Sequence, residues 1–393
     1  MADAFILSAV RTPVGRAFKG TLRQVRPDEL AAAAIMEALS RVKGVDHSAV
    51  DDVVLGCAMP EAEQGLNIAR MASLQAGLPH EVSAMTLNRF CASGLEAINY
   101  AASRIKLGEA DLVVAGGVES MSLIPMGGNK VSPNLQVVET HPEFYISMGL
   151  TAERVAAKYE VTREAQDRFA LHSHEKAVKA IEAGKFDEEL LPVTVRTPVL
   201  GARGKVEVQE AVFEIDECPR ADTSLEALAG LKPAFMVDGT VTAGNSSPMN
   251  DGAAAVVVAS AKMTKKLGVE PLGKFVAYAT AGVDPELMGI GPALAVPKVL
   301  KKTGLALKDI GLIELNEAFA SQSVYVVGKL GIPDERVNVN GGAIALGHPL
   351  GCTGAKLTAT ILYEMRRRKA KYGLVTMCVG GGMGAAGIVE RVE

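Results

Sequence analysis

Tryptophan is absent from this chain of 393 residues, and aromatic residues make up only 4% of it. The apolar interior must therefore be built from Ala, Val, Leu, Ile and Met, because hydrophobic residues still account for 48% of the chain. Charged residues account for 22%, which is typical of a globular protein and excludes a mainly disordered chain. At this length we expect two or three domains, or one large duplicated unit.

The chain also lacks an excess of positive charge and a long hydrophobic run. Its 41 Lys and Arg residues against 45 Asp and Glu residues give a formal net charge of -4, which argues against general nucleic-acid binding. No apolar run approaches the roughly 20 residues of a membrane-spanning helix, so no membrane span is expected. The first residues lack a basic segment followed by an apolar one, and we expect no secretory signal.

Cysteine is scarce, and the number of cysteines is odd. The five are Cys57, Cys91, Cys218, Cys352 and Cys378. A sparse and odd set in a chain of this size argues against a disulfide framework and favours a reducing compartment, the cytoplasm or an organelle matrix. None of them has paired C-x-x-C spacing, so we expect no metal site.

Short apolar runs alternate with helical patterns along the chain, which predicts an α/β fold. The predicted strands are Phe5–Val10, Val53–Gly56, Ala84–Asn88, Leu112–Ala115, Ala254–Ala259, Phe275–Ala281, Leu312–Leu315, Val337–Asn340, Leu374–Val379 and Ala386–Val392. The predicted helices are Pro27–Val42, Ala92–Leu107, Ala152–Tyr159, Arg163–Ala183, Pro292–Thr303 and Thr353–Lys369. The 40 Gly residues predict tight turns and close approaches of the backbone.

An internal repeat is visible, because three segments recur in the same order at a nearly constant spacing of about 260 residues. The paired segments are Asp52–Cys57 with Gly311–Asn316, Ser93–Gly94 with Thr353–Gly354, and Asp111–Val118 with Gly373–Gly380. We therefore predict two related halves, residues 1–120 (completed by about 245–265) and residues 266–393, with an inserted loop domain at residues 121–244.

Cys91 follows a predicted strand and precedes a predicted helix, within the segment Asn88–Leu95. A thiol at a helix N-terminus lies where the partial positive charge of the helix favours a thiolate. The backbone N–H groups at such a position can also bind an oxyanion. A small buried side chain is the alternative role, which most cysteines fulfil. From this segment alone the two roles are equally supported.

His348 lies in a glycine-rich turn before the predicted helix Thr353–Lys369, and Pro349 stiffens the backbone after it. For a Cys–His pair it is the best candidate base. A turn histidine whose ring is satisfied by backbone hydrogen bonds is the alternative. The other histidines are expected in loops or on helix surfaces: His47, His80, His141, His172 and His174.

Two further residues follow predicted strands. Cys378 lies near the end of Leu374–Val379 and precedes Gly380–Gly382, whose N–H groups can face an anionic oxygen. A core cysteine is the alternative. Asn316 follows Leu312–Leu315, where a polar side chain can project into a cleft. An N-cap of the next helix is the alternative, and both roles can hold together.

Taken together, these segments resemble the thiolases of the degradative type, which are acetyl-CoA C-acyltransferases, over essentially the whole chain. The segments that carry the resemblance are Asn88–Gly94, Gly116–Ser122, Gly239–Ser247, Asn316–Ala320, Asn340–Gly354 and Cys378–Gly384. The resemblance implies a duplicated five-layer αβαβα fold with an inserted, CoA-binding loop domain. That implication agrees with the repeat, which was found independently of it.

The resemblance also implies a mechanism. Cys91 attacks the acyl carbonyl of a 3-oxoacyl-CoA, and His348 takes the thiol proton. Cys378 protonates the departing acetyl-CoA carbanion equivalent, and free CoA then takes the acyl group from Cys91. One oxyanion hole is formed by His348 and, through a water, Asn316; the N–H groups of Cys91 and Gly380 form the other. Such chemistry needs a base beside a site that stabilises an enolate.

Substrate-binding residues are implied by the resemblance as well: Met148, Ala243, Ser247, Met288, Phe319 and Arg220. Met288 corresponds to a methionine beside the acyl group, and Arg220 is expected near the CoA phosphates. The segment Ser147–Glu153 lacks the His-Met-Gly motif that short-chain biosynthetic thiolases usually carry. We therefore expect a 3-ketoacyl-CoA thiolase of fatty-acid β-oxidation, with a short-chain acetyl-CoA C-acetyltransferase acting in biosynthesis as the alternative.

No permanently bound cofactor is expected, since coenzyme A is a substrate. The expected partners are acyl-CoA and CoA, a second copy in a homodimer or homotetramer, and other β-oxidation enzymes. A non-catalytic CoA- or lipid-binding relative is one rival, but Cys91, His348 and Cys378 together count against it. A condensing enzyme of the ketoacyl synthase type is another, and such enzymes typically carry His or Asn in place of Cys378.

Overall fold

The computed structural model describes residues 2–200 and 205–392. Its large mixed sheet contains β1 Ala4–Arg11, β2 Gly15–Arg16, β3 Asp52–Gly56, β4 Ser83–Leu87, β5 Leu112–Ser120, β8 Asn250–Ser260, β9 Gly273–Gly282, β10 Ile310–Leu315, β11 Tyr372–Val379 and β12 Met383–Glu390. The strand order is β10-β11-β12-β9-β1-β8-β5-β3-β4, and β2 pairs with β8.

The sheet consists of two sets of strands that meet where β1 pairs with β9, and the two sets have the same pattern of strand pairing. On one side β3 pairs with β5 in parallel, and β5 and β1 pair with β8 in antiparallel fashion. On the other side β10 pairs with β11 in parallel, and β11 and β9 pair with β12 in antiparallel fashion. The two sets meet at Phe5 and Ile6, which pair with Lys274 and Gly273. The predicted duplication of the fold is confirmed.

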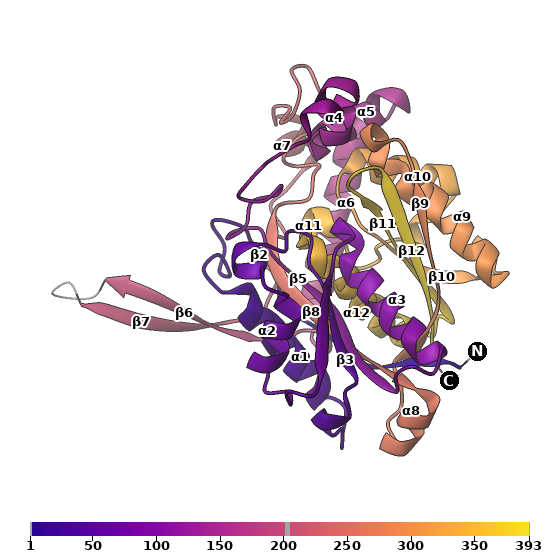
Figure 1. Ribbon diagram of the computed structural model, residues 1–393. Coiled ribbons are helices and arrows are strands. Elements are labelled where there is room, and N and C mark those ends of the chain that lie inside the picture. Colours follow the sequence, from indigo (N-terminus) through magenta and orange to yellow (C-terminus); the bar gives the residue numbers. More distant parts are fainter. Residues whose placement is uncertain (1, 201–204, 393) are drawn as a thin grey trace.

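Helices lie between the two sets of strands and outside each of them (Figure 1). The principal ones are α1 Pro27–Ser40, α2 Ile68–Gln75, α3 Ser93–Lys106, α8 Ala261–Leu267, α9 Gly291–Thr303, α10 Ala320–Leu330, α11 Ala343–Leu346 and α12 Leu350–Arg368. In the middle layer, α3 and α12 share one apolar core with strands of both halves. Separate cores hold α1 and α2 on one outer face, and α9 and α10 on the other.

Strand β8 shows how one strand serves two layers. Val256 and Val258 belong to the central core, whereas Val257 and Ala259 belong to the core under α1 and α2. Successive side chains of a strand point to opposite faces, so a strand buried on both faces must be apolar throughout. The run of alanine and valine in the sequence meets this requirement without any aromatic side chain.

Glycines let α3 and α12 approach each other closely. A Cβ atom on Gly94 would lie 2.8 Å from the backbone nitrogen of Ala355, and one on Gly354 would lie 2.2 Å from that of Leu95. These two contacts are equivalent under the repeat, which pairs Gly94 with Gly354. Because no side chain fits at either position, the N-terminal ends of the two central helices can meet.

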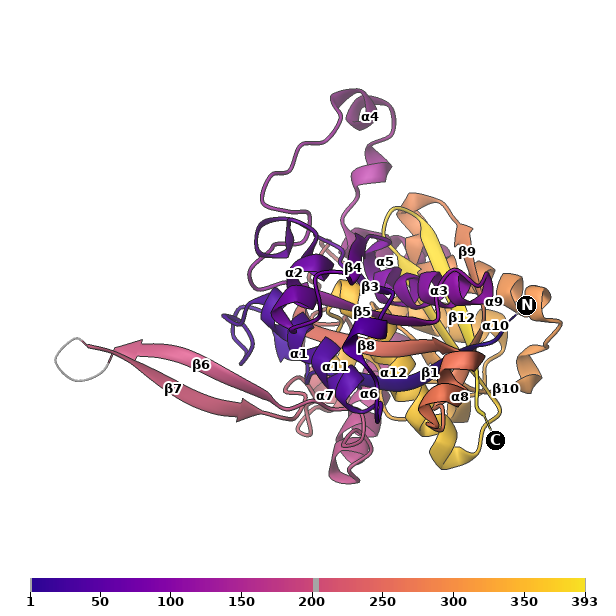
Figure 2. The same ribbon diagram turned by 60° about the horizontal axis from the view of Figure 1, so that its bottom comes forward.

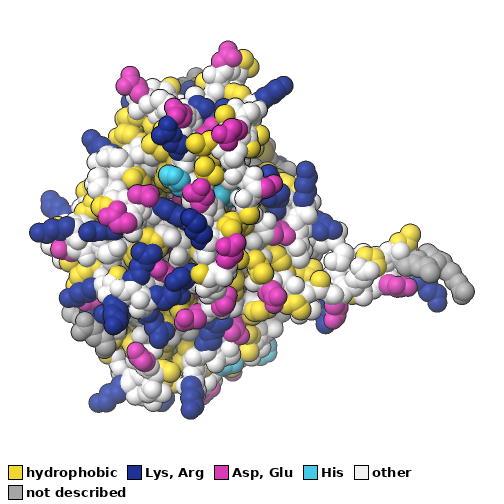
Figure 3. Space-filling model, turned by 180° about the vertical axis from the view of Figure 1, so that it is seen from behind, with side chains coloured by type: hydrophobic (Ala, Val, Ile, Leu, Met, Phe, Trp, Pro, Cys, Tyr) yellow, Lys and Arg dark blue, Asp and Glu magenta, His cyan; other side chains and the backbone are white. Residues whose placement is uncertain are grey.

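The region between the two halves contains α4 Leu135–Thr140, α5 Met148–Lys158, α6 Arg163–Glu182, β6 Val193–Leu200, β7 Val206–Phe213 and α7 Leu225–Ala229. Strands β6 and β7 form a two-stranded arm that projects from the body, as Figures 1, 2 and 3 show. Residues 201–204 of the predicted loop domain lie outside the described residues. On the face in Figure 3, side chains of both charge signs occur across the surface.

One predicted strand, Val337–Asn340, is wrong. Only Val337 forms a bridge, to Ile313, and Asn338 has a positive φ of 44°. The Asn338 side chain accepts a hydrogen bond from the N–H of Leu315 and donates one to its carbonyl, both at 2.8 Å. A side-chain amide thus takes the place that a strand partner would occupy.

Several elements escaped prediction, among them α2, α8, α10 and the arm. Strand β6 contains Pro198, which reads as a break in a strand, but a two-stranded ribbon leaves edge positions that need no N–H donor. Within the described residues, no helix has the length and apolar character needed to cross a membrane.

Candidate active site

A cavity of about 590 Å³ lies where the N-terminal ends of α3 and α12 face the inserted region. Eight predicted residues line it: Cys91, Met148, Arg220, Ala243, Ser247, Met288, Phe319 and His348. The other three predicted residues lie directly behind its wall. Asn316 contacts His348, Cys378 packs with Met288 and Phe319, and the N–H of Gly380 faces Cys91. The structure therefore brings all the predicted site residues together.

Cys91 lies in a single 3₁₀ turn, Phe90–Ala92, just before α3 begins. Its side chain is buried, and the N–H groups of Gly380 and of Cys91 itself face the sulfur and favour its thiolate form. Burial nevertheless raises the thiol pKa to about 12, with a smaller contribution from the charge of Glu119. The structure thus differs from our expectation of a thiolate at a helix N-terminus, because desolvation outweighs the local dipoles.

His348 occupies the turn between α11 and α12. Its Nδ1 lies 2.6 Å from Thr353 Oγ1, and that hydroxyl donates its proton to the carbonyl of Pro349 at 2.9 Å. Because a hydroxyl has one proton, Nδ1 must be the donor to Thr353. The lone pair is therefore on Nε2, which lies 3.3 Å from Asn316 Nδ2. This is the tautomer that a base directed toward the cavity requires.

The imidazole is also kept neutral. Burial, assisted by the charge of Lys356, lowers the pKa of His348 to about 3. With the Cys91 thiol above its ordinary pKa, the resting pair is thiol and imidazole rather than thiolate and imidazolium. Transfer of the thiol proton must then accompany attack on a carbonyl, when charge develops on an oxygen that the site can stabilise.

Asn316 directly follows β10, where its N–H donates to the carbonyl of Thr376 at 2.9 Å. Helix α10 begins at Ala320 with Phe319 at its N-cap, so Asn316 is not the cap of that helix. Its amide Oδ1 is buried and has no hydrogen-bond partner among the described residues. The N-cap alternative is excluded, and the amide remains available to the site.

Cys378 lies near the end of β11 and is fully buried. Burial raises its pKa well above the ordinary value, and the neighbouring Cys91 raises it further. The chain then turns through Gly381 and Gly382, whose φ angles are 78° and 85°. A neutral thiol at this position can donate a proton, and it can take one back when the product of that transfer is stabilised.

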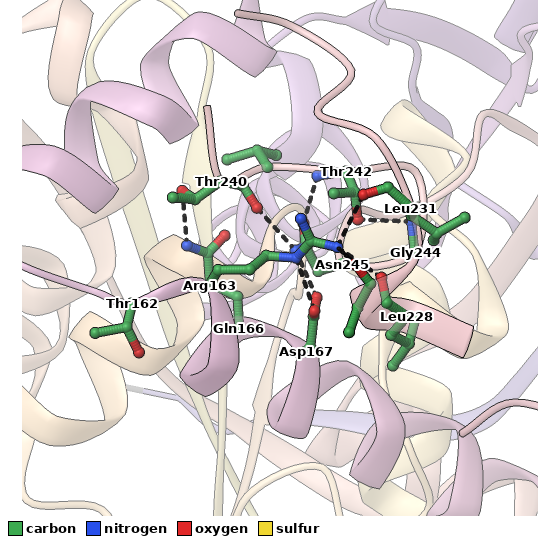
Figure 4. A network of polar contacts seen from close by, with 12 residues as sticks. Thr162, Arg163, Gln166, Asp167, Leu228, Leu231, Thr240, Thr242, Gly244 and Asn245 are labelled. Atoms are coloured by element: carbon green, nitrogen blue, oxygen red, sulfur yellow. Dashed lines mark hydrogen bonds and ion pairs between the residues drawn. The ribbon is translucent and has the colours of Figure 1, made fainter. Parts of the chain in front are cut away.

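Helix α6 anchors the segment 239–247 through polar contacts (Figure 4). The residues of this segment that line the cavity are Ala243, Gly244, Ser246 and Ser247. Asp167 accepts hydrogen bonds from Arg163 Nε at 2.7 Å and from Asn245 Nδ2 at 2.9 Å. The Oδ1 atom of Asn245 in turn accepts from the N–H of Thr242 at 2.8 Å. An ion pair on the helix thus sets the conformation of the loop that carries Ala243 and Ser247.

One histidine was misplaced by the sequence analysis. His174 is buried and lines the cavity, and its Nδ1 accepts the N–H of Arg220 at 3.1 Å. Burial, followed by the charge of Arg220, lowers its pKa to about 4. The spacing of His174 from the small residues Ala170 and Ala177 on α6, four and three positions away, was the signal for a buried helix face.

The chain belongs to the thiolase family. It matches the thiolase N-terminal domain over residues 4–262 and the thiolase C-terminal domain over residues 269–391. The protein is therefore an acyltransferase enzyme, and the thiolase-like five-layer fold is confirmed.

The chain is 55% identical to the 3-ketoacyl-CoA thiolase of Bacillus subtilis (strain 168) over 390 residues, which cover 99% of this chain and 100% of that protein. The crystal structure of human mitochondrial 3-ketoacyl-CoA thiolase is similar with a TM-score of 0.90 and 39% identity, covering 100% and 99% of the two chains. That of the Bacillus anthracis acetyl-CoA acetyltransferase has a TM-score of 0.89 and 44% identity, with the same coverage.

Proposed function

We propose that this enzyme is a 3-ketoacyl-CoA thiolase that cleaves 3-oxoacyl-CoA with CoA to give acetyl-CoA and a shortened acyl-CoA. The observation that carries the proposal is that Cys91 and His348 line one cavity with Cys378 directly behind its wall, while the imidazole is neutral and its Nε2 carries the lone pair beside Asn316. Two thiols and one base are what transfer of an acyl group between carbon and sulfur requires.

In the first half-reaction, Cys91 Sγ bonds to the 3-oxo carbon while its proton moves to His348 Nε2. The bond between C2 and C3 then breaks, and its electron pair becomes the enolate of acetyl-CoA. Cys378 gives its proton to C2 of that enolate, which leaves an acyl thioester on Cys91. Next to the site, the Nε2–H that His348 has gained and the amide of Asn316 are placed to stabilise the enolate oxygen.

In the second half-reaction, the thiol of a CoA molecule attacks the thioester carbon and displaces the sulfur of Cys91. The proton of the CoA thiol replaces the one that Cys378 gave up. His348 returns the proton on its Nε2 to the departing sulfur of Cys91, so both cysteines and the imidazole return to their starting state. The N–H groups of Cys91 and Gly380, which face the sulfur in the free enzyme, are placed to bind the oxyanion of each tetrahedral intermediate.

The rest of the cavity suits an acyl-CoA. Met148, Met288 and Phe319 form an apolar wall together with Cys378. This wall supports a position for the acyl chain beside the reacting sulfur atoms. Arg220 and Ser247 lie on parts of the lining that come from the inserted region and its closing loop. A cation there suits the phosphates of CoA.

We assign the enzyme to fatty-acid β-oxidation, in the cytoplasm or an organelle matrix, as a homodimer or homotetramer that can work with other enzymes of that route. A short-chain acetyl-CoA C-acetyltransferase is the second candidate, and it is favoured by the similarity to the structure of that name. The segment Ser147–Glu153, without a histidine before Met148, supports the degradative assignment.

The experiment that separates the two is thiolysis of 3-oxoacyl-CoA substrates from C4 to C16. The degradative assignment predicts that kcat/KM rises from C4 to a longer chain by at least about tenfold, because each buried methylene adds about 0.8 kcal/mol of transfer free energy. Activity confined to acetoacetyl-CoA would instead support the short-chain enzyme. No thiolysis of any substrate would contradict both.

A further inference from the structure

Glu119, at the end of β5, is a buried carboxylate outside the proposed catalytic set. Its Oε2 accepts hydrogen bonds from the N–H groups of Ala58 and Gly351, both at 2.8 Å. Its Oε1 accepts from the N–H of Met59 at 3.1 Å and from Gln64 Nε2 at 2.8 Å. One side chain thus joins the loop after β3, the 3₁₀ turn of residues 62–64 and the first turn of α12.

Every partner of this carboxylate is a donor. The thiol of Cys57, with its sulfur 3.8 Å from Oε1, is a fifth. A protonated carboxyl group would need an acceptor for its own proton, and none of these partners offers one. Burial raises the pKa of Glu119, whereas the hydrogen bonds from Ala58, Gln64 and Gly351 lower it. Although the pKa of Glu119 is raised overall, the donors themselves favour the anion, because they form charge-assisted hydrogen bonds and leave no acceptor for a carboxyl proton.

The partners of Glu119 form the walls around the nucleophile. Ala58 and Met121 pack against Cys91, and Leu350, which precedes Gly351, packs there too. Gly351 fits tightly, because a Cβ atom at this position would lie 2.7 Å from the Cα atom of Cys57. The N–H of Gly351 belongs to the helix turn that directly follows His348 and Pro349. Glu119 consequently contacts both the cysteine pocket and the histidine turn.

The groups that face the Cys91 thiol are few. His348 and Cys378 share its site, and both are neutral in the free protein. Burial is the main reason why the Cys91 thiol stays protonated, and among the described residues the charge of Glu119 adds to it, because a nearby negative charge disfavours the thiolate. Cys57 lies between Glu119 and the strand β3 and is itself a neutral buried thiol, because burial and the charge of Glu119 raise its pKa.

We propose that Glu119 is a positioning residue: it holds the Cys91 pocket and the His348 turn in register, and its charge adds to the burial that keeps Cys91 protonated until His348 receives the proton. This inference rests on the proposed thiolase function. It explains why a carboxylate is buried beside a nucleophilic thiol, where it works against the thiolate. If Cys91 were a thiolate before substrate bound, proton transfer to His348 could no longer accompany attack on the carbonyl, and the thiolate would react with other electrophiles.

The test compares Glu119→Gln with Glu119→Asp. In Glu119→Gln the new NH₂ group must face two N–H donors in either orientation, and the charge is lost. We expect kcat for thiolysis to fall about thirtyfold, because unpaired buried donors displace the Cys91 pocket and the His348 turn. KM for CoA should stay within about twofold of the wild-type value. We also expect the rate of Cys91 alkylation by iodoacetamide at pH 8 to rise about tenfold, which corresponds to a thiol pKa lower by roughly one unit.

Glu119→Asp is the matched control, because it keeps the charge and shortens the reach. We expect kcat to fall while the alkylation rate of Cys91, followed by peptide mass mapping, stays within about twofold of the wild type. A second control is the double variant Glu119→Gln with Gln64→Glu. The carboxylate introduced at position 64 can accept from the amide introduced at position 119 and from the N–H of Ser120, as Gln64 already does. It loses the hydrogen bond that Gln64 Nε2 donates to the carbonyl of Met59, so the rescue is expected to be partial. In this double variant kcat and the alkylation rate should move back toward wild type.

Unchanged kcat and unchanged alkylation in Glu119→Gln would overturn the proposal. Equal acceleration of alkylation in the Gln and Asp variants would remove the charge effect, since a loosened pocket would then explain the result. If Glu119→Gln does not fold, the Asp variant and the double variant still decide between charge and reach. Failure of the wild-type enzyme to form an acyl adduct on Cys91 would count against the proposed function instead, whatever the alkylation rates show.

Discussion

The two halves of the fold have the same strand pairing and the same central helix, yet they differ at every reactive position. The N-terminal half places Cys91 before α3, whereas the repeat places Gly351 at the corresponding point of α12. The C-terminal half carries Cys378 near the end of β11, whereas Gly116 corresponds to it on β5. Neither glycine has room for a side chain: an added Cβ would lie 2.7 Å from backbone at Gly351 and 2.1 Å from backbone at Gly116.

The two halves therefore share a pattern of strands and central helices, but they do not each contain a copy of the active site. Two helix N-termini meet at Gly94 and Gly354. In the proposed mechanism one half then provides the nucleophile, and the other provides the base and the second thiol. A symmetric site would hold two identical thiols, whereas this reaction needs a nucleophile and an acid with separate surroundings. Residues that break the repeat are therefore where the chemistry lies.

The largest effect on kcat is expected when Thr353, the hydrogen-bond partner of His348 Nδ1, is substituted and His348 itself is kept. Thr353→Val removes the acceptor of the Nδ1 proton while keeping the shape of the side chain, so the imidazole can adopt the wrong tautomer. We expect kcat to fall about a hundredfold, as expected for the loss of a positioned general base.

Thr353→Ser is the matched control, because it keeps the hydroxyl, and it should retain kcat within about threefold. The pH profile of kcat/KM serves as the second readout, and Thr353→Val should shift its acidic limb while Thr353→Ser leaves it in place. Equal activity of the Val and Ser variants would show that the hydroxyl does not select the tautomer.

A smaller effect, on the free energy of unfolding, is expected where α3 and α12 come into contact at Gly94 and Gly354. Gly354→Ala forces a methyl group to within 2.2 Å of the backbone nitrogen of Leu95, so α3 and α12 must separate. We expect the free energy of unfolding to fall by about 2 kcal/mol, the usual cost of overpacking, and urea denaturation measures it.

Gly328→Ala, on α10, is the control for this substitution. Nothing lies within 4 Å of the added Cβ there, so the higher helix propensity of alanine should raise stability by about 0.5–1 kcal/mol. Similar losses in both variants would show that the close approach of the central helices is not what makes Gly354 necessary.

The sequence was sufficient to predict the duplication and the positions of most strands along the chain, and the resemblance to the thiolases supplied most of the residues that meet at the cavity. These features have local or repeated signals, such as a small residue after a strand or a glycine before a helix. Glu119 had no such signal, because its role arises from contacts with residues far away in the chain, and the role of Thr353 depends on a side-chain contact with His348 that the sequence does not show. His174 had only its helical spacing from two small residues of α6. The high pKa of Cys91 also escaped prediction, since local helix dipoles are visible in a sequence and burial is not.

The central claim is that Cys91 alone carries the acyl group, although Cys378 lies at the same site. Intact-mass analysis after addition of an acyl-CoA to wild type, Cys91→Ala and Cys378→Ala tests it most directly. We predict an acyl adduct on the wild type and on Cys378→Ala, with Cys378→Ala unable to exchange the α-hydrogens of acetyl-CoA, and no adduct on Cys91→Ala. A persistent adduct on Cys91→Ala, or undiminished exchange in Cys378→Ala, would contradict the division of roles between the two halves.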